Sequence, residues 1–355
     1  MPEVKTFRYT KPFQLESGKQ LPGFKLAYTT EGILNSRKDN VVWVFHALTA
    51  NSEATDWWHG LVGKGKLFDP EKYFIICVNM PGSCYGSIGP LDKDPQTGEP
   101  FYHDFPFFTI RDMVYAYKLL KNHLGIKKIF SGIGGSMGGQ QLLEWAVEEP
   151  ELFEYIFPIA TNAIHSAWGI AFNESQRLSI ECDASWKEKN DLAGIEGMKV
   201  ARSIALISYR NYITYNASQS DSAHDKIENF KTASYQRYQG EKLARRFNAF
   251  SYYFLSKGMD AHNVGRNRAS VENALKQITA KALVIGITTD ILFPLADQQF
   301  LSQHIPNAQL QVIYSNYGHD GFLLEFEQIE ISIKEFLNIH NSPNFQIHSL
   351  NYGSR

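Results

Sequence analysis

The chain has 355 residues, with 35 lysines and arginines against 37 aspartates and glutamates, which gives a formal net charge of −2. Hydrophobic residues make up 43% and charged residues 20%, so the chain can bury a large core and does not have the composition of a disordered protein. The near-neutral charge excludes nucleic-acid binding driven by bulk charge. No stretch approaches the roughly 18–20 apolar residues of a membrane span. Residues 1–13 lack the apolar centre of a secretory signal, so we expect a cytoplasmic enzyme.

Short apolar runs alternate with helical patterns through the first half of the chain. Residues 41–45 and 73–78 are compact runs of β-branched and aromatic residues, which is typical of strands buried on both faces of a parallel sheet. A helical pattern covers residues 109–124, and Gly125 ends it. Next come an expected strand at 128–133, a helix at 137–147 and a strand at 154–160. This alternation indicates crossover connections and a parallel sheet.

The middle of the chain has a different character. Residues 166–276 are mostly polar and helical, contain no convincing strand, and include an expected loop at 216–225. The α/β alternation then returns as a strand at 282–287, a helix at 296–304, a strand at 310–314 and a helix at 323–337, followed by a polar tail from Asn338. We therefore predict an α/β core made of residues 1–165 and 277–355, with residues 166–276 inserted as a helical lid.

The sequence Gly134-Gly135-Ser136-Met137-Gly138 has the form G-x-S-x-G and lies where a strand ends and a helix begins. In this setting a sharp turn holds the serine hydroxyl above the sheet, and the amide of the next residue points into the same space. We predict that Ser136 is a nucleophile and that the Met137 amide is one donor of an oxyanion hole. The competing interpretation is a glycine-rich turn that only packs a helix against a strand.

A serine nucleophile needs a base and an orienting carboxylate. His319 follows the last expected strand, and Asp290 follows the strand before it. The order Ser136, Asp290, His319 is the order of the α/β-hydrolase fold, and all three residues lie at carboxyl ends of expected strands. Taken alone, His319 suits a surface loop and Asp290 suits a turn or a helix N-cap.

The second oxyanion donor is expected in the loop after an early strand. His46-Ala47-Leu48-Thr49 follows the strand at 41–45 directly, and we assign the Leu48 backbone amide to this role. His46 precedes Ser136 in the chain, against the order of the fold, so we expect it to hold the loop by hydrogen bonding.

Set side by side, these motifs resemble the homoserine O-acyltransferase family of α/β-hydrolase-fold enzymes. The matching segments span nearly the whole chain in the expected order. They are Leu15 to Gly18, His46 to Thr49, Trp57-Trp58, Cys84 to Ser87, Asp104-Phe105-Pro106, Thr109 to Val114, Gly134 to Gly139, Glu144-Trp145-Ala146, Asp290 to Pro294 and Gly318-His319-Asp320. The G-x-S-x-G motif alone indicates only the superfamily, whereas the segments Thr109 to Val114 and Gly134 to Gly139 are more specific.

The resemblance implies transfer of an acetyl group from acetyl-CoA to the hydroxyl of L-homoserine in methionine biosynthesis, through an acyl-serine. It implies small-molecule substrates, no permanently bound cofactor and a homodimer. Succinyl-CoA as donor and L-serine as acceptor stay open, because relatives use them. A serine esterase or thioesterase, in which water is the acceptor, and a non-catalytic binding protein on the same fold are further alternatives.

The resemblance also implies partners for the carboxylate and ammonium of an amino-acid acceptor. The matching residues are Arg202 and Tyr209 in the lid and Asp320 after the histidine. Arg202 and Tyr209 are seven residues apart, about two helical turns, so one helix presents both on one side. Without the resemblance, Arg202 suits a solvated helix surface and Asp320 suits a helix cap, and Arg210 is a weaker candidate.

Other basic and thiol side chains can be explained without a role in catalysis. Arg245-Arg246 and the pair Arg266 and Arg268 either meet the phosphates of CoA or belong to a solvated face. Cys84 suits a small loop residue better than a nucleophile, because no histidine pattern accompanies it. The three cysteines match no metal-binding spacing, so we expect no metal site.

Overall fold

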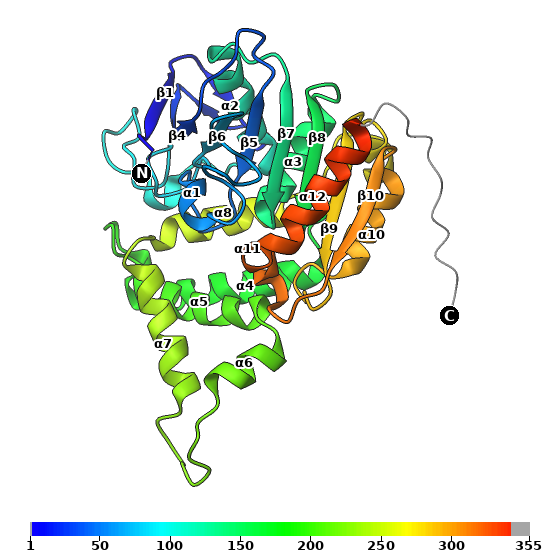
Figure 1. Ribbon diagram of the computed structural model, residues 1–355. Helices are drawn as coiled ribbons and strands as arrows, with labels where there is room; N and C mark the ends of the chain where they lie inside the picture. The colour runs from blue at the N-terminus through cyan, green and yellow to red at the C-terminus, as the bar shows by residue number, and fades with distance from the viewer. Residues whose placement is uncertain (1, 342–355) are drawn as a thin grey trace.

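The protein, represented by a computed structural model that describes residues 2–341, is built on one eight-stranded sheet (Figure 1). The strands follow the spatial order β1-β4-β6-β5-β7-β8-β9-β10. Their bounds are Lys5–Tyr9 for β1, Phe24–Glu31 for β4, Val41–Phe45 for β5, Phe74–Val78 for β6, Ile129–Gly135 for β7, Phe153–Ile159 for β8, Lys281–Ile287 for β9 and Ala308–Ile313 for β10. A separate two-stranded sheet pairs β2 (Phe13–Gln14) with β3 (Gln20–Leu21).

Most of the sheet is parallel, as the sequence predicts. Strands β6, β5, β7, β8, β9 and β10 pair in parallel, whereas β1 and β4 join the edge antiparallel. Successive residues of β5 alternate between two hydrophobic clusters, with Trp43 and Phe45 in one and Val42 and Val44 in the other. The sheet is therefore buried on both faces, which explains why its strands are almost continuously apolar.

Helices cover both faces of this sheet. Helices α2 (Ile110–His123), α3 (Met137–Glu148) and α10 (Leu295–His304) pack on one face, and α12 (Phe326–Asn341) lies on the other together with the short α1 (Ala54–Trp57) (Figure 1). A capping box fixes the start of α2, because Thr109 and Asp112 each accept a hydrogen bond from the other's backbone amide. The α/β-hydrolase architecture that the sequence predicts is confirmed.

Between β8 and β9 the described residues form helices and no named strand, and Figure 1 shows most of these helices stacked below the sheet. They are α4 (Ala167–Glu181), η2 (Ala184–Lys187), α5 (Ile195–Tyr209), α6 (Tyr212–Gln219), α7 (Lys231–Ala244), α8 (Ala249–Asp260) and α9 (Val271–Leu275). We propose that residues 166–276 form the lid, as their composition predicts. Helices α6 and α7 reach farthest from the sheet (Figure 1).

The last predicted helix is interrupted. The expected single helix at 323–337 is wrong, because α11 (Gly321–Leu324) ends before Glu325 and α12 begins at Phe326. The indole Nε1 of Trp58 donates a 3.0 Å hydrogen bond to the Phe322 carbonyl, which a continuous helix would offer to the Phe326 amide. A tryptophan that is distant in the sequence but packs in the same hydrophobic cluster thus competes with the helix for this acceptor.

The predicted lid loop at 216–225 is also shifted. Helix α6 continues to Gln219, so the loop covers residues 220–230. Asn211 starts this helix, because its side chain accepts a hydrogen bond from the Ile213 amide, and no glycine or proline interrupts the turns that follow. Residues 342–355, most of the predicted polar tail, lie outside the described residues. No helix within residues 2–341 combines the length and the apolar character needed to cross a bilayer.

Candidate active site

The turn between β7 and α3 has the geometry that the G-x-S-x-G motif predicts. Ser136 adopts φ 57° and ψ −129°, a left-handed conformation that a residue with a side chain rarely takes. The two flanking glycines are required by close backbone contacts. A Cβ on Gly138 would lie 2.2 Å from the Phe45 carbonyl oxygen, and one on Gly134 would lie 2.5 Å from the Gly138 backbone. The strained serine is thus held at the start of a helix, where its hydroxyl is presented above the sheet.

A histidine and an aspartate are joined next to this turn. The Nδ1 atom of His319 lies 2.7 Å from Oδ2 of Asp290, and both side chains are buried. The other carboxylate oxygen of Asp290 accepts hydrogen bonds from the Leu292 and Phe293 amides, at 2.8 and 2.9 Å. The aspartate therefore has a turn role as well as an imidazole partner. This arrangement fixes the histidine tautomer with Nε2 free to accept a proton.

Aromatic rings fix the position of the imidazole. The ring of Phe293 stacks on His319 at a centroid distance of 5.1 Å, and Phe322 lies at 5.2 Å. The histidine thus has little freedom to leave its carboxylate. No hydrogen bond joins Ser136 to His319 in the described structure, a contact that often tightens only when substrate binds.

One cavity of about 360 Å³ collects most of the predicted site residues. Ser136, His319, Leu48, Arg202, Tyr209 and Asp320 all line it. Asp290 lies behind the imidazole, and Met137 is buried at the first position of α3. The cavity lies between the core and the lid, because its walls come from the loop after β5, the turn after β7 and the lid helices α5 and α7.

The predicted oxyanion donors are both available. Neither the Leu48 amide nor the Met137 amide donates a hydrogen bond to another described residue. Met137 is the first residue of α3, where helix geometry leaves the amide without an intrahelical acceptor and the helix dipole is positive. The site therefore offers two N–H groups to a developing negative charge.

His46 holds the loop that carries Leu48, as the sequence predicts. Its Nε2 accepts a 3.1 Å hydrogen bond from the Met80 amide, so the proton is on Nδ1, which lies 2.9 Å from the Ala47 carbonyl oxygen. The ring is fully buried, and this burial lowers the pKa of His46 from 6.5 to about 4. His46 is consequently a neutral structural residue.

Because the unfolded chain binds a proton at His46 below pH 6.5 and the folded chain binds it only near pH 4, acid should destabilise the fold. Between pH 7.5 and pH 5 the free energy of unfolding should fall by about 2 kcal/mol through this residue. Urea unfolding at both values checks this: His46→Gln, which keeps an acceptor for the Met80 amide, should reduce the pH-dependent loss by that amount. The exposed His59→Gln variant is the control, and an equal pH dependence in both variants would contradict the assignment.

The three residues that the resemblance assigns to acceptor binding lie close to the predicted catalytic histidine. The Arg202 guanidinium lies 5.6 Å from the Tyr209 ring, and that ring lies 5.7 Å from His319, so α5 presents both side chains to the site. Asp320 forms an ion pair with Arg210, with Nε and Oδ2 2.9 Å apart. Burial raises the pKa of Asp320, and the charges of Arg210, His319 and Arg202 oppose this rise. Asp320 does occupy the N-cap position of α11, but its side chain accepts no capping hydrogen bond and pairs with Arg210 instead.

Several residues at the cavity have no clear sequence signal, and two predicted cations are elsewhere. Lys242, Asp56, Phe322 and Leu323 line the cavity but belong to no recognisable motif. Arg266 and Arg268 form ion pairs with Glu16 and Glu144, so both interpretations of this pair, phosphate contact and solvated face, are wrong.

Burial raises the pKa of the Cys84 thiol to about 11, which fits a loop residue rather than a nucleophile. No group of three potential metal ligands occurs within the described residues.

Comparisons with known proteins agree with this geometry. The family model of the alpha/beta hydrolase fold matches residues 40–326. The homoserine O-acetyltransferase of Cyclobacterium marinum is 48% identical over 330 residues, which cover 93% of this chain and 94% of the relative. The chain belongs to the homoserine O-acetyltransferase family.

Solved structures place this family beside esterases. The homoserine O-acetyltransferase of Bacillus anthracis superposes with a TM-score of 0.86 at 25% identity, and the match covers 95% of this chain and 98% of that one. Esterase E22 superposes with a TM-score of 0.85, also at 25% identity, over 95% of this chain and all of that one. The same fold thus occurs in acyltransferases and in esterases. The two reactions differ in the acceptor, so the residues that bind the acceptor must distinguish them.

Proposed function

We propose that this chain transfers an acetyl group from acetyl-CoA to the side-chain hydroxyl of L-homoserine, a reaction of methionine biosynthesis. The observation that carries the proposal is the shared cavity. It joins Ser136 and His319 to Arg202, Tyr209 and Asp320, a set suited to an α-amino acid. The guanidinium of Arg202 matches a carboxylate, and the carboxylate of Asp320 matches an ammonium group. We also propose, from the family, that the enzyme is a cytoplasmic homodimer.

The chemistry follows from the placement of the side chains. His319 takes the proton of Ser136 while Oγ attacks the thioester carbonyl, and the oxyanion is stabilised by the Leu48 and Met137 amides. The carbon–sulfur bond breaks, and the histidine gives its proton to the departing thiolate. The homoserine hydroxyl, deprotonated by the same histidine, then attacks the acetyl-serine ester, and Ser136 recovers its proton. Asp290 orients the imidazole and stabilises its cation throughout.

Thiol release from acetyl-CoA distinguishes a transferase from a hydrolase. We expect release to be slow with the protein alone and to rise by at least about tenfold when L-homoserine is added, because the bound amino acid replaces water as the acceptor. A thiol-reactive dye follows the reaction, and O-acetylhomoserine is identified by mass spectrometry. Release that is equally fast without the amino acid would contradict the proposal and favour an esterase or thioesterase.

The same assay tests the acceptor site and the remaining alternatives. Arg202→Gln should keep the slow release seen without acceptor but lose most of the stimulation by homoserine. Arg237→Gln, an arginine in lid helix α7 that does not line the cavity, is the matched control and should respond as the unmodified protein does. Succinyl-CoA as donor and L-serine as acceptor, run in the same plates, show directly whether another member reaction is faster.

A further inference from the structure

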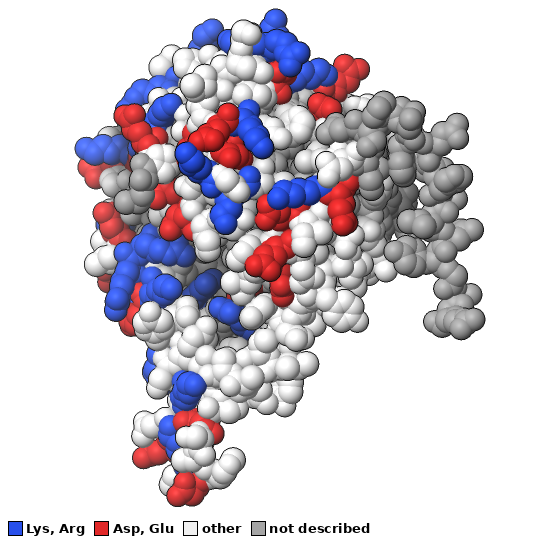
Figure 2. All heavy atoms as spheres, viewed as in Figure 1, with Lys and Arg blue, Asp and Glu red and all other residues white. Residues whose placement is uncertain are grey.

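Basic side chains gather where the end of lid helix α7 meets the core. Figure 2 shows blue side chains around a hollow on this part of the surface, between the region of α1 and the lid helices. Three basic residues, Arg202, Lys242 and Arg246, and two acidic residues, Asp56 and Asp320, line the cavity. Arg202 lies beside Tyr209 and the histidine, whereas Lys242 lies in the last turn of α7 and Arg246 follows two residues after that helix ends.

Lys242 and Arg246 are not neutralised by carboxylates. Within residues 2–341, Lys242 makes no ion pair and no side-chain hydrogen bond, and Arg246 pairs with no acidic side chain. One guanidinium nitrogen of Arg246, Nη1, donates to the Thr49 carbonyl at 2.5 Å and to the Tyr85 hydroxyl at 2.6 Å. The remaining atoms, Nη2 and Nε, keep their donors available. Arg246 is thus fixed in place while part of its fork stays free for an anion.

Helix electrostatics explain the sign of these charges but not their placement. Cations near a helix carboxyl end stabilise the helix by about 0.3–1 kcal/mol, and Lys242 lies in the last turn of α7. That effect requires no contact with the cavity and no anchor to Thr49. Arg245, at the same helix end, has equal access to the dipole but does not line the cavity. A purely helical role would therefore treat Lys242 and Arg245 alike.

We propose that Lys242 and Arg246 form the binding site for the phosphate groups of the acyl donor. This inference rests on the proposed function, since it assigns to the nucleotide end of the thioester the side of the cavity that Arg202 and Asp320 do not use. The lysine ammonium supplies a point charge and the arginine a fork, which together suit phosphate oxygens. Because Arg246 also holds the carbonyl of Thr49, the residue after the oxyanion donor Leu48, one side chain links donor binding to the oxyanion loop.

Lys242→Gln is the sharper test, because within residues 2–341 it breaks no ion pair and no side-chain hydrogen bond. We expect kcat/KM for acetyl-CoA to fall by about five- to tenfold, the loss of one charged contact to a phosphate. The acetyl thioester of pantetheine, which has no phosphate, should lose much less, so the ratio of the two values falls. Arg245→Gln is the matched control and should leave both values unchanged. Titration calorimetry measures the affinity for CoA of the same two variants in an inactive Ser136→Ala background. It therefore compares Lys242→Gln with Arg245→Gln in the absence of turnover.

The outcomes separate the two levels of the proposal. The proposed phosphate site is wrong if Lys242→Gln lowers kcat/KM equally for both donors, or for neither, or if Arg245→Gln has the same effect as Lys242→Gln. In each of these cases the proposed acetyl transfer still stands. If the unmodified protein transfers acetyl from neither donor, the proposed function itself fails. Acetyl-dephospho-CoA identifies the group that is bound: loss of the Lys242 effect assigns it to the 3′-phosphate, and retention assigns it to the diphosphate, and both support the site.

Discussion

Replacing Ser136 by alanine is expected to lower kcat for acetyl transfer by about 10⁴- to 10⁶-fold, because the acetyl group then has no oxygen to which it can be attached. The fold should persist, since alanine removes one atom from a side chain that makes no hydrogen bond as a cap. CoA should still bind, because the residues proposed to hold it are elsewhere. The loss should therefore appear in kcat and not in the affinity for the donor.

Mass spectrometry of the intact protein makes this test specific. After mixing with acetyl-CoA in the absence of homoserine, the unmodified protein should gain the mass of one acetyl group, and Ser136→Ala should gain none. Ser131→Ala is the control, because Ser131 is a fully buried serine in β7, the strand that leads to Ser136, and its hydroxyl has no hydrogen-bond partner. This control should be acetylated and turn over. Acetylation of the Ser136→Ala protein would remove Ser136 from the mechanism.

The parts of the fold that were predictable have local signals. The strand at β5 is a run of five apolar residues, and the turn at Ser136 needs glycines that nothing else at those positions can replace. Asp290 and His319 are predictable because parallel strands bring their carboxyl ends to one edge of the sheet, so a position in the chain implies a position in space. Their side-chain contact at 2.7 Å agrees with that expectation.

The parts that were not predictable depend on contacts between distant residues. The break after Leu324 follows from Trp58, which is 264 residues from the carbonyl it binds. Arg266 and Arg268 meet carboxylates 250 and 124 residues away, so the sequence around them contains no sign of an ion pair. Lys242 reaches the cavity only because of how α7 packs on α5. Periodicity and motif spacing report neighbours along one element, and none of these partners is such a neighbour.

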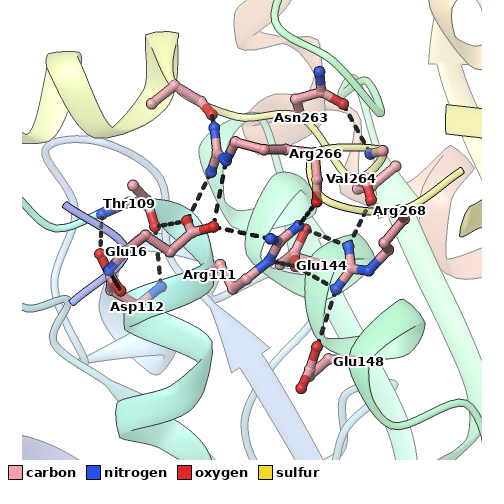
Figure 3. A network of polar contacts seen from close by, with 12 residues as sticks. Glu16, Thr109, Arg111, Asp112, Glu144, Glu148, Asn263, Val264, Arg266 and Arg268 are labelled. Atoms are coloured by element: carbon pink, nitrogen blue, oxygen red, sulfur yellow. Dashed lines mark hydrogen bonds and ion pairs between the residues drawn. The ribbon is translucent and has the colours of Figure 1, made fainter. Parts of the chain in front are cut away.

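The ion pairs of Arg266 and Arg268 belong to a network that joins the lid to the core (Figure 3). Glu144 in α3 is almost fully buried and contacts Arg111 at 2.6 Å and Arg268 at 2.8 Å. Glu16, near the amino terminus, pairs with Arg111 and Arg266. The network thus connects the N-terminal segment, α2, α3 and the chain that returns from α8 to α9.

Opposing effects act on the carboxylates of this network. Burial alone would raise the pKa of Glu16, but hydrogen bonds from Arg266 and Thr109 and the nearby charges of Arg111 and Arg266 outweigh it, and the pKa is lowered. The folded state therefore favours the ionised form of Glu16. A network of this kind is costly to disturb, because removing one member takes a charged partner away from side chains that are largely withdrawn from water.

Glu144→Gln should accordingly lower the free energy of unfolding by about 3–5 kcal/mol, since it leaves the guanidinium groups of Arg111 and Arg268 without their central carboxylate. Urea unfolding measures the loss. Glu71→Gln is the matched control, because it breaks an exposed pair with Lys64 and should cost less than about 1 kcal/mol. If Glu144→Gln does not fold, Glu148→Gln, which removes a partner of Arg268 that is less buried than Glu144, should show a smaller loss in the same direction. Equal losses for Glu144→Gln and Glu71→Gln would contradict this role.

The position of Glu144 also gives this stability effect a consequence for catalysis. Helix α3 starts at Met137, directly after Ser136, and Glu144 lies two turns farther along the same helix. The chain that returns from the lid is fixed to this helix through Arg268, so one end of the lid is anchored to the helix that begins directly after the serine. In the Glu144→Gln protein we therefore expect the KM for homoserine to rise more than the rate of acetylation of Ser136 falls, because lid placement affects the acceptor first.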